Sequence, residues 1–175
     1  MQNNFVIALR DVLVSEGLWS DDPTDAGGAT MKGITLSVYR EWKRNQYITK
    51  EQLKEVSDSD VYNLYKQLYW DKINADNLPA GVDYAVFDAA VNLGVARATK
   101  LIQEAVGVTT DGVLGLKSLS AIQAADNKEL IEKFSNLKKS FYDSIVEHRP
   151  DQIKYLDGWK SRVAKVETIS ESMLG

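Results

Sequence analysis

Apolar residues recur every three to four positions along most of the chain, which is the spacing of an amphipathic α-helix. The first such segment runs from Phe5 to about Glu16, where Gly17 follows. Further helices are predicted over residues 35–45, 57–68, 82–93, 96–106, 115–122, 126–148 and 159–173. A short helix is also predicted to begin at residue 49. The pattern predicts a mainly α fold built as a helical bundle.

Local signals mark several helix boundaries. Thr35, Ser57 and Asp126 are predicted N-caps, because short polar side chains there accept backbone N–H groups. Thr49-Lys50-Glu51-Gln52 has the form of a capping box. Gly107 and Pro150 are predicted to stop the helices before them.

The segment between Gly17 and Ile34 breaks the helical pattern. It contains Pro23, Gly27, Gly28 and Gly33, which favour tight turns. The best interpretation is a short β-hairpin or looped ribbon. A second break, Asn77 to Gly81, predicts a boundary between region 1–78, which carries the hairpin, and helical region 79–175, the two packed as one compact unit. Asp111-Gly112 is predicted to be a turn.

Composition narrows the classes of function. The 175 residues carry a net charge of −4, which argues against nucleic acid as the main partner. Basic residues after Lys133 alternate with acidic ones, so they indicate a solvated helical face. The absence of cysteine excludes disulfides and zinc–thiolate sites. His148 is the only histidine, so no Ser–His pair is available, and we expect neither a cofactor nor a metal.

The first residues have no cationic lead, and Arg10 and Asp11 interrupt the apolar run. This pattern resembles neither a signal peptide nor a membrane anchor. We therefore expect synthesis in the cytoplasm without stable membrane insertion, and a substrate outside the membrane would then need another route of export. We also expect a monomer.

Candidate chemistry lies around the first break. Glu16 stands at a helix end and faces a turn-rich segment that holds Asp25 and Thr30. Glycoside hydrolysis needs one carboxylic acid near the scissile oxygen and a second polar group that manages water or positive charge. Asp25 has an alternative role as a turn residue that caps the backbone near Gly27, and the role of Thr30 is equally open. Counting from Asp21, the calcium-loop template fails at three of five key positions, which excludes an EF-hand.

The same residues carry a resemblance to a known family. The pattern E-G-x-x-x-x-D-P-x-D-x-G-G-x-T-x-x-G-I-T, from Glu16 to Thr35, resembles the signature of the family 108 glycoside hydrolases, N-acetylmuramidases found among phage endolysins. The resemblance implies a lysozyme-like fold with Glu16 as general acid. By similarity to other phage lysozymes, it also implies that Asp25 and Thr30 place a water for an inverting reaction.

The second half resembles the family's predicted peptidoglycan-binding region. The matching motifs are Leu68-Tyr69-Trp70-Asp71, Val86 to Gly94, Leu101-Ile102-Gln103, Asp111-Gly112-x-x-Gly115 and Gly158-Trp159-x-x-Arg162-Val163. Asp88 and Asn92 share one helical face, where they would either bind sugar groups or link to a neighbouring helix. Trp19 and Trp70 are candidate aromatic contacts for a sugar ring, whereas Trp159 is expected in the core.

Together with these residues, the resemblance predicts a peptidoglycan muramidase that cleaves the β-1,4 bond between N-acetylmuramic acid and N-acetylglucosamine. It implies that an enzyme made in the bacterial cytoplasm without an export signal reaches the periplasm or cell wall through a holin-like pore or a secretion system. The alternative is a catalytically silent peptidoglycan-binding module with the same fold. A helical protein–protein adaptor is disfavoured, because a plain bundle would not need the Gly-rich segment.

Overall fold

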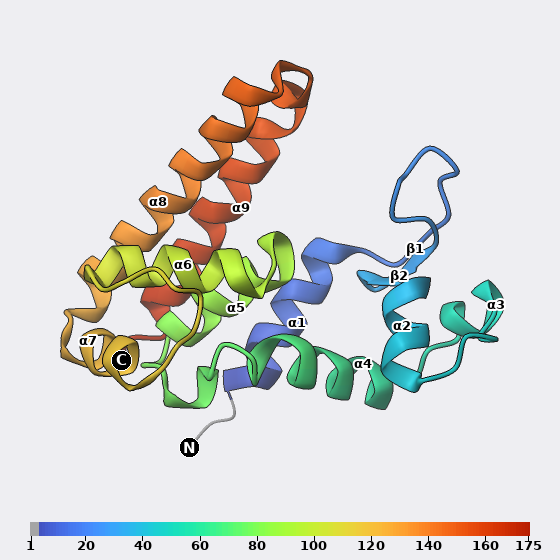
Figure 1. Cartoon of the computed structure of the whole chain (residues 1–175), viewed down its shortest axis with the longest axis horizontal. Coiled ribbons are helices and arrows are strands. Elements are labelled where there is room, and N and C mark those ends of the chain that lie inside the picture. Colours follow the sequence, from blue (N-terminus) through green and yellow to red (C-terminus); the bar gives the residue numbers. More distant parts are fainter. Residues whose placement is uncertain (1–3) are drawn as a thin grey trace. The chain divides into compact units, whose positions relative to one another are not determined.

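The computed structural model describes residues 4–175, and it confirms the mainly α class with one small sheet (Figure 1). The first three positions of the predicted region 1–78 lie outside the described residues. The α-helices are α1 Asn4–Glu16, α2 Leu36–Lys43, α3 Lys50–Lys54, α4 Asp58–Tyr65, α5 Val82–Leu93, α6 Val95–Val106, α7 Leu116–Ala124, α8 Asn127–His148 and α9 Ile153–Ser172. The strands are β1 Trp19–Ser20, β2 Thr30–Met31 and β3 Ile34–Thr35. Shorter helical elements are the π-helix η1 Lys66–Trp70 and the 3₁₀ turns η2 Ala75–Asn77 and η3 Pro150–Gln152.

The described chain divides into two compact units, residues 4–68 and residues 69–175. The division falls within η1, where the helix widens to π-type geometry. The boundary predicted at 78/79 falls later in the chain, just after η2.

The predicted caps of the first unit are present. Thr35 and Ser57 each accept the backbone N–H three residues on, at 3.1 Å. Thr49 and Gln52 form the capping box in both directions, at 3.2 and 2.9 Å. Short-range side-chain chemistry therefore sets these helix starts, as the sequence predicts.

Helix α2 is fastened to α4. The Tyr39 hydroxyl donates to Asp60 at 2.7 Å, and the Lys43 ammonium lies 2.8 Å from the same carboxylate. Burial together with the Asp60 carboxylate raises the pKa of Tyr39 to about 12. Arg44 adopts a left-handed conformation (φ 54°), which ends α2 two positions before the predicted Asn45.

The predicted hairpin is present and gains a third strand. Strand β2 pairs antiparallel with both neighbours, in the order β1-β2-β3. Each strand is two residues long, so the sheet holds one local segment together and does not form a layer of the fold. The segment 21–29 loops out between β1 and β2.

In the second unit α5 forms the centre of the core, because every residue from 82 to 90 is buried. Its start packs against α9 at Gly81. A Cβ on Gly81 would lie 2.4 Å from the Ser170 carbonyl oxygen, and its φ of +85° also favours glycine. Only glycine allows this approach of the two backbones.

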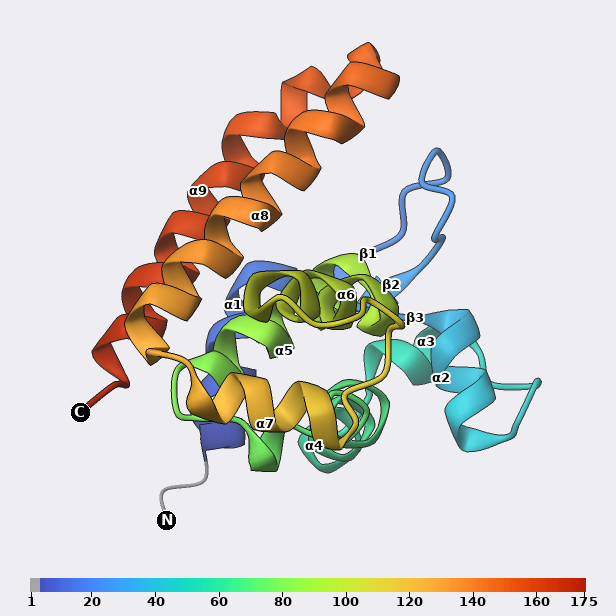
Figure 2. The same ribbon diagram turned by 60° about the vertical axis from the view of Figure 1, so that its left-hand side comes forward.

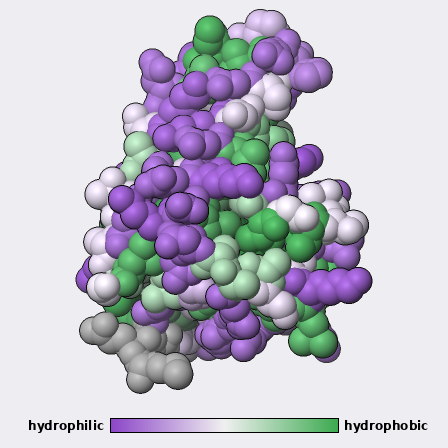
Figure 3. All heavy atoms as spheres, turned by 90° about the vertical axis from the view of Figure 1, so that its left-hand side faces the viewer, coloured by the Kyte–Doolittle hydropathy of each residue, from purple (hydrophilic) through white to green (hydrophobic). Residues whose placement is uncertain are grey.

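Helices α8 and α9 run antiparallel and side by side (Figure 2). Helix α9 begins at Ile153, earlier than the predicted Trp159, because Pro150 starts the 3₁₀ turn η3 that leads directly into it. Hydrophilic residues cover much of this helix pair on the face shown in Figure 3.

Gln103 holds the loop between α6 and α7. Its amide nitrogen donates to Asp111 at 2.7 Å, and its amide oxygen accepts the Gly112 N–H at 3.0 Å. The predicted Asp111-Gly112 turn is confirmed. Within residues 4–175, none of the helices has the length and apolar character needed to cross a membrane.

Candidate active site

Glu16 is the last residue of α1. Gly17 follows in the left-handed conformation (φ 76°), and its N–H donates to the Leu13 carbonyl at 3.2 Å, which terminates the helix. The Glu16 side chain is half-buried, and its Oε1 is shielded from solvent. The helix end therefore fixes the backbone from which this carboxyl group projects.

The turn between β2 and β3 packs directly against Glu16. It consists of Lys32 and Gly33, both with positive φ (51° and 77°), as a tight two-residue hairpin turn requires. A Cβ on Gly33 would lie 2.9 Å from Glu16 Cβ and 2.6 Å from the Tyr65 hydroxyl oxygen. Glycine at this position is what allows the acid, the turn and Tyr65 to meet.

Helix α4 anchors the same turn from the other side. The Tyr65 hydroxyl donates to the Lys32 carbonyl at 2.7 Å, and the Lys32 ammonium pairs with Asp58 at 2.8 Å. The Lys32 N–H donates to the Leu18 carbonyl at 3.1 Å. Lys32 thus tolerates a conformation that favours glycine because three contacts hold its backbone and side chain.

Thr30 and Trp19 lie in the small sheet. Thr30 is opposite Ser20 on β1 and Thr35 on β3, and its side chain is half-buried. The half-buried Trp19 ring has the Lys54 ammonium 5.4 Å from its centroid. Both residues therefore belong to the sheet whose turn contacts Glu16.

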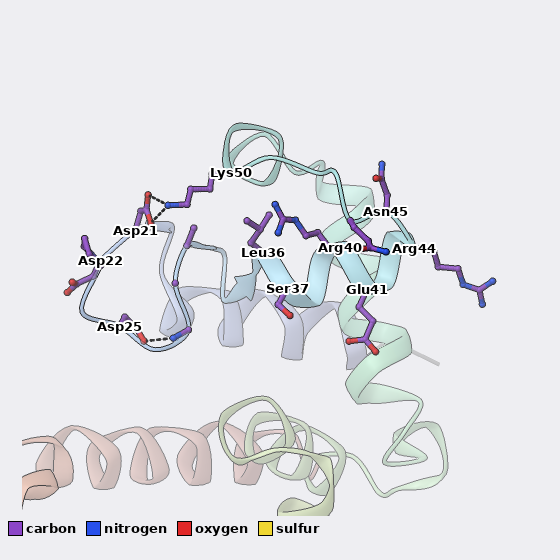
Figure 4. Close-up of a pocket in the computed structure, with 15 residues that line it drawn as sticks. Asp21, Asp22, Asp25, Leu36, Ser37, Arg40, Glu41, Arg44, Asn45 and Lys50 are labelled. Carbon is purple, nitrogen blue, oxygen red and sulfur yellow. Dashed lines mark hydrogen bonds and ion pairs between the residues drawn. The ribbon is translucent and has the colours of Figure 1, made fainter.

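Asp25 lies in the exposed loop between β1 and β2. Its Oδ1 accepts the Gly27 N–H at 3.0 Å, the one side-chain hydrogen bond that Asp25 makes within the described chain (Figure 4). The turn-forming role is therefore present in the structure. Its solvent-exposed carboxylate is open to water, and a catalytic role stays a prediction.

A groove of about 850 Å³ lies between this loop and α2 (Figure 4). Its charged lining residues are Asp21, Asp22, Asp25, Arg40, Glu41, Arg44 and Lys50. The Lys50 ammonium joins Asp21 at 3.0 Å. Glu16 does not line the groove, which shares Asp25 with the predicted catalytic set.

Asp88, predicted as a substrate contact, is instead a buried structural ion. It pairs with Lys138 at 2.8 Å and with Arg162 at 2.9 Å, and it is 1% exposed. Burial alone would raise the pKa of Asp88, but the two cations outweigh it and hold the pKa below the usual value. The prediction is corrected: a charge this deep and already paired by α8 and α9 does not meet a sugar.

Asn92 and Trp70 also serve the second unit's packing. Asn92 donates to the Tyr142 hydroxyl, which links α5 to α8 as the structural alternative predicted. The Trp70 ring is 2% exposed, packs edge-on to Phe87 with centroids 5.4 Å apart, and donates to Asp76 at 2.7 Å. Its burial corrects the prediction of a sugar contact.

The sequence did not single out Tyr65, Lys32 or Arg40. Tyr65 has the spacing of an ordinary core residue. Its hydrogen bond to Lys32 spans 33 positions, so no local sequence motif indicates this contact. Within residues 4–175 no group of three or more His, Asp or Glu side chains is placed to hold a metal ion.

Two family models match successive parts of this chain, and a solved structure resembles nearly all of it. The family model described as Glycosyl hydrolase 108 matches residues 9–94, and the model described as Predicted Peptidoglycan domain matches residues 97–164. A solved structure titled "Structure of Brucella abortus SagA" is 32% identical, with a TM-score of 0.87, and the match covers 99% of this chain and 97% of that one. No curated protein matches.

The first match contains Glu16, the small sheet and the groove, and the second contains most of α6, all of α7 and α8, and the first part of α9. The structural match extends over nearly the whole chain at substantial identity. The chain therefore belongs to the glycosyl hydrolase 108 family, as a glycoside hydrolase of lysozyme-like, mainly α fold that acts on peptidoglycan.

Proposed function

We propose that the protein is an N-acetylmuramidase that hydrolyses the β-1,4 bond between N-acetylmuramic acid and N-acetylglucosamine, with Glu16 as general acid. One observation carries the proposal: the Gly33 turn packs against Glu16 at the end of α1, inside the segment that matches the hydrolase family. A carboxyl group held by backbone packing is the kind of pre-positioned acid that proton donation requires.

In the proposed reaction the Glu16 carboxylic acid donates its proton to the oxygen of the leaving sugar. A water attacks the anomeric carbon from the opposite face, and the exposed Asp25 carboxylate accepts the proton that this water loses. Thr30 orients the water through its hydroxyl. The single displacement inverts the anomeric configuration, as in glycosidases whose carboxyl groups lie about 6.5–9.5 Å apart.

The exposed loop supports this division of roles. Gly27 binds one oxygen of Asp25, so the other remains available to a water. Residues 21–29 lie between two strands of the sheet that also carries Thr30, so the loop and the hydroxyl share one support.

Analysis of the products of a peptidoglycan digest tests the proposal. Mass spectrometry should find the new reducing ends on muramic acid, and NMR should record the α-anomer before mutarotation. New reducing ends on glucosamine would overturn the bond assignment. A first-formed β-anomer would overturn the single displacement while leaving Glu16 as the acid.

A second candidate is a catalytically silent peptidoglycan-binding module, which the match of residues 97–164 favours. Binding to cell walls without any new reducing ends would establish it. For either role, we propose that the protein acts where peptidoglycan lies, in the periplasm or cell wall.

A further inference from the structure

The groove between the loop 21–29 and α2 has a charge pattern that a neutral sugar chain would not need. Arg40 and Glu41 come from α2, Asp22 and Asp25 come from the loop, and Lys50 of α3 is paired with Asp21 (Figure 4). Such a groove suits a ligand that carries both carboxylate and ammonium groups. Its volume of about 850 Å³ is in the range of sites that enclose small ligands.

Arg40 is prepared to bind a carboxylate. Its Nε donates to the Ile48 carbonyl at 2.8 Å, which fixes the plane of the guanidinium group. Within the described chain no carboxylate forms an ion pair with Arg40, so its terminal nitrogens remain available. A guanidinium group held this way can bind a carboxylate through two parallel hydrogen bonds.

The loop supplies the opposite charge. The hydroxyl and backbone N–H of Thr24 both donate to Asp22, and these bonds lower the pKa of Asp22. Asp25 is likewise held by Gly27. Both carboxylates are therefore held by turns of the loop that lines the groove, where Asp22 can pair with an ammonium group of a ligand.

We propose that this groove binds the peptide stems of peptidoglycan, with stem carboxylates on Arg40 and the free amine of an uncrosslinked stem on Asp22. The inference rests on the proposed function, because peptide stems are attached to the muramic acid sugars whose bond Glu16 would cleave. Asp25, the proposed base, lines the groove, so a sugar at the site of hydrolysis would present its peptide to the groove. The enzyme thus recognises uncrosslinked, peptide-bearing glycan rather than bare glycan.

The test compares kcat/KM for peptide-bearing peptidoglycan with kcat/KM for glycan chains whose peptides an amidase has removed. The wild type should prefer the peptide-bearing substrate. The Arg40→Gln variant should lose roughly three- to tenfold of that preference, the effect of a partly exposed charge-assisted contact. The matched control is Arg10→Gln, an exposed cation on α1 outside the groove, which should keep the wild-type ratio.

Equal rates of the wild type on both substrates, or an unchanged ratio in Arg40→Gln, would overturn the inference. Failure of the wild type to cleave either substrate would instead contradict the proposed function. Because the bond from Arg40 to Ile48 also supports the local fold, Asp22→Asn provides a second variant with the same expected direction, since its amide oxygen can keep both bonds from Thr24.

Direct binding gives a readout that needs no catalysis. NMR titration of the full chain with a free, uncrosslinked stem peptide should shift the signals of residues 21–28 and α2, and added salt should weaken the binding. A peptide with amidated carboxyl groups should bind less tightly. Shifts elsewhere in the chain, or none, would exclude the groove as the peptide site.

Discussion

At the level of single residues, Gly33 packs directly against the side chain of Glu16. Glu16 gains its position from the end of α1, and Gly33 gives it the space it occupies. Neither residue is unusual alone, but together with Tyr65 they form a packed contact between α1, the β2–β3 turn and α4. Changes at either residue should therefore be visible in activity.

Replacing Glu16 by Gln keeps the shape of the side chain and removes the proton that it would donate in the proposed reaction. We expect peptidoglycan hydrolysis to fall by about 10²- to 10⁴-fold, the usual contribution of general acid catalysis. The far-UV CD spectrum and melting temperature should not change. Glu55→Gln, an exposed residue at the end of α3, is the control. More than about a tenth of wild-type turnover in Glu16→Gln would remove Glu16 from the role of acid.

Asp25 and Asp22 form a matched pair, because each accepts a backbone N–H two residues on in the same loop. Asparagine can accept the same bond, so Asp→Asn at either position isolates the charge. On bare glycan, Asp25→Asn should reduce kcat by less than the loss of about 10²-fold or more expected for the acid, and Asp22→Asn should reduce it less still. Equal effects of the two changes would show that Asp25 acts only as a loop carboxylate.

A methyl group at position 33 should displace the Glu16 side chain without altering its carboxyl group. Gly33→Ala strains a backbone with φ +77° and places its Cβ under 3.0 Å from both Glu16 and Tyr65. We expect a stability loss of about 1–3 kcal/mol and a loss of activity above tenfold, because small displacements of catalytic groups are costly. Gly107→Ala is the control, with φ +72° but open space around it. It should lose stability and keep its activity per folded molecule.

At the level of elements, α5, α8 and α9 meet around one buried carboxylate. Asp88 of α5 is held between Lys138 of α8 and Arg162 of α9. Removing one member of a buried ion group leaves the others uncompensated, which is why such groups tolerate change poorly.

The Asp88 group should make the second unit sensitive to acid. Because the folded-state pKa is lowered, its contribution is present above the unfolded pKa, near 3.8, and is lost as the pH falls through the folded value. Asp88→Asn should cost about 3–5 kcal/mol near neutral pH and flatten the decline in stability below about pH 4. Denaturant titrations from pH 2 to 7 measure both effects (the range extends about two units below and about three above the usual aspartate pKa). Asp157→Asn, an exposed change on α9, should match the wild type.

The sequence predicted the structural elements that are determined by residues close together in the chain. The Thr49 capping box, the Ser57 cap and the bounds of α5 depend on residues within one helical turn of one another, so they can be found in a single chain. The partners of Asp88 and Trp70 are set by tertiary packing, and spacing on one helical face could not separate a sugar contact from a buried pair. The groove beside Arg40 has no local signal either, since loop and helix meet only in the fold.

At the level of the whole molecule, two family matches fall on successive parts of one chain. The hydrolase match ends at residue 94 and the peptidoglycan-domain match begins at residue 97. Glu16 lies in the first match, so catalysis and attachment to the wall should be separable by a single substitution.

Full-length Glu16→Gln should therefore still bind cell walls. We expect its sedimentation with purified peptidoglycan to match that of the wild type within about twofold, because an amide keeps the hydrogen-bonding shape of the acid. The wild-type measurement is made on ice over a short time, so that hydrolysis does not remove the ligand. Loss of binding in Glu16→Gln would show that attachment depends on the acid's own site.

The Asp88 ion group also has a consequence for how the chain matures during synthesis. Asp88 is separated from Lys138 by 50 positions and from Arg162 by 74. Translation runs from the N-terminus, so α5 emerges from the ribosome long before either cation exists. Until α9 has been made, the most deeply placed carboxylate of the second unit cannot be buried without a large desolvation cost. The second unit should thus complete its core only after α9 has been made, whereas Glu16, Gly33 and Tyr65 all lie within residues 4–68 and can come together while the ribosome is still at work.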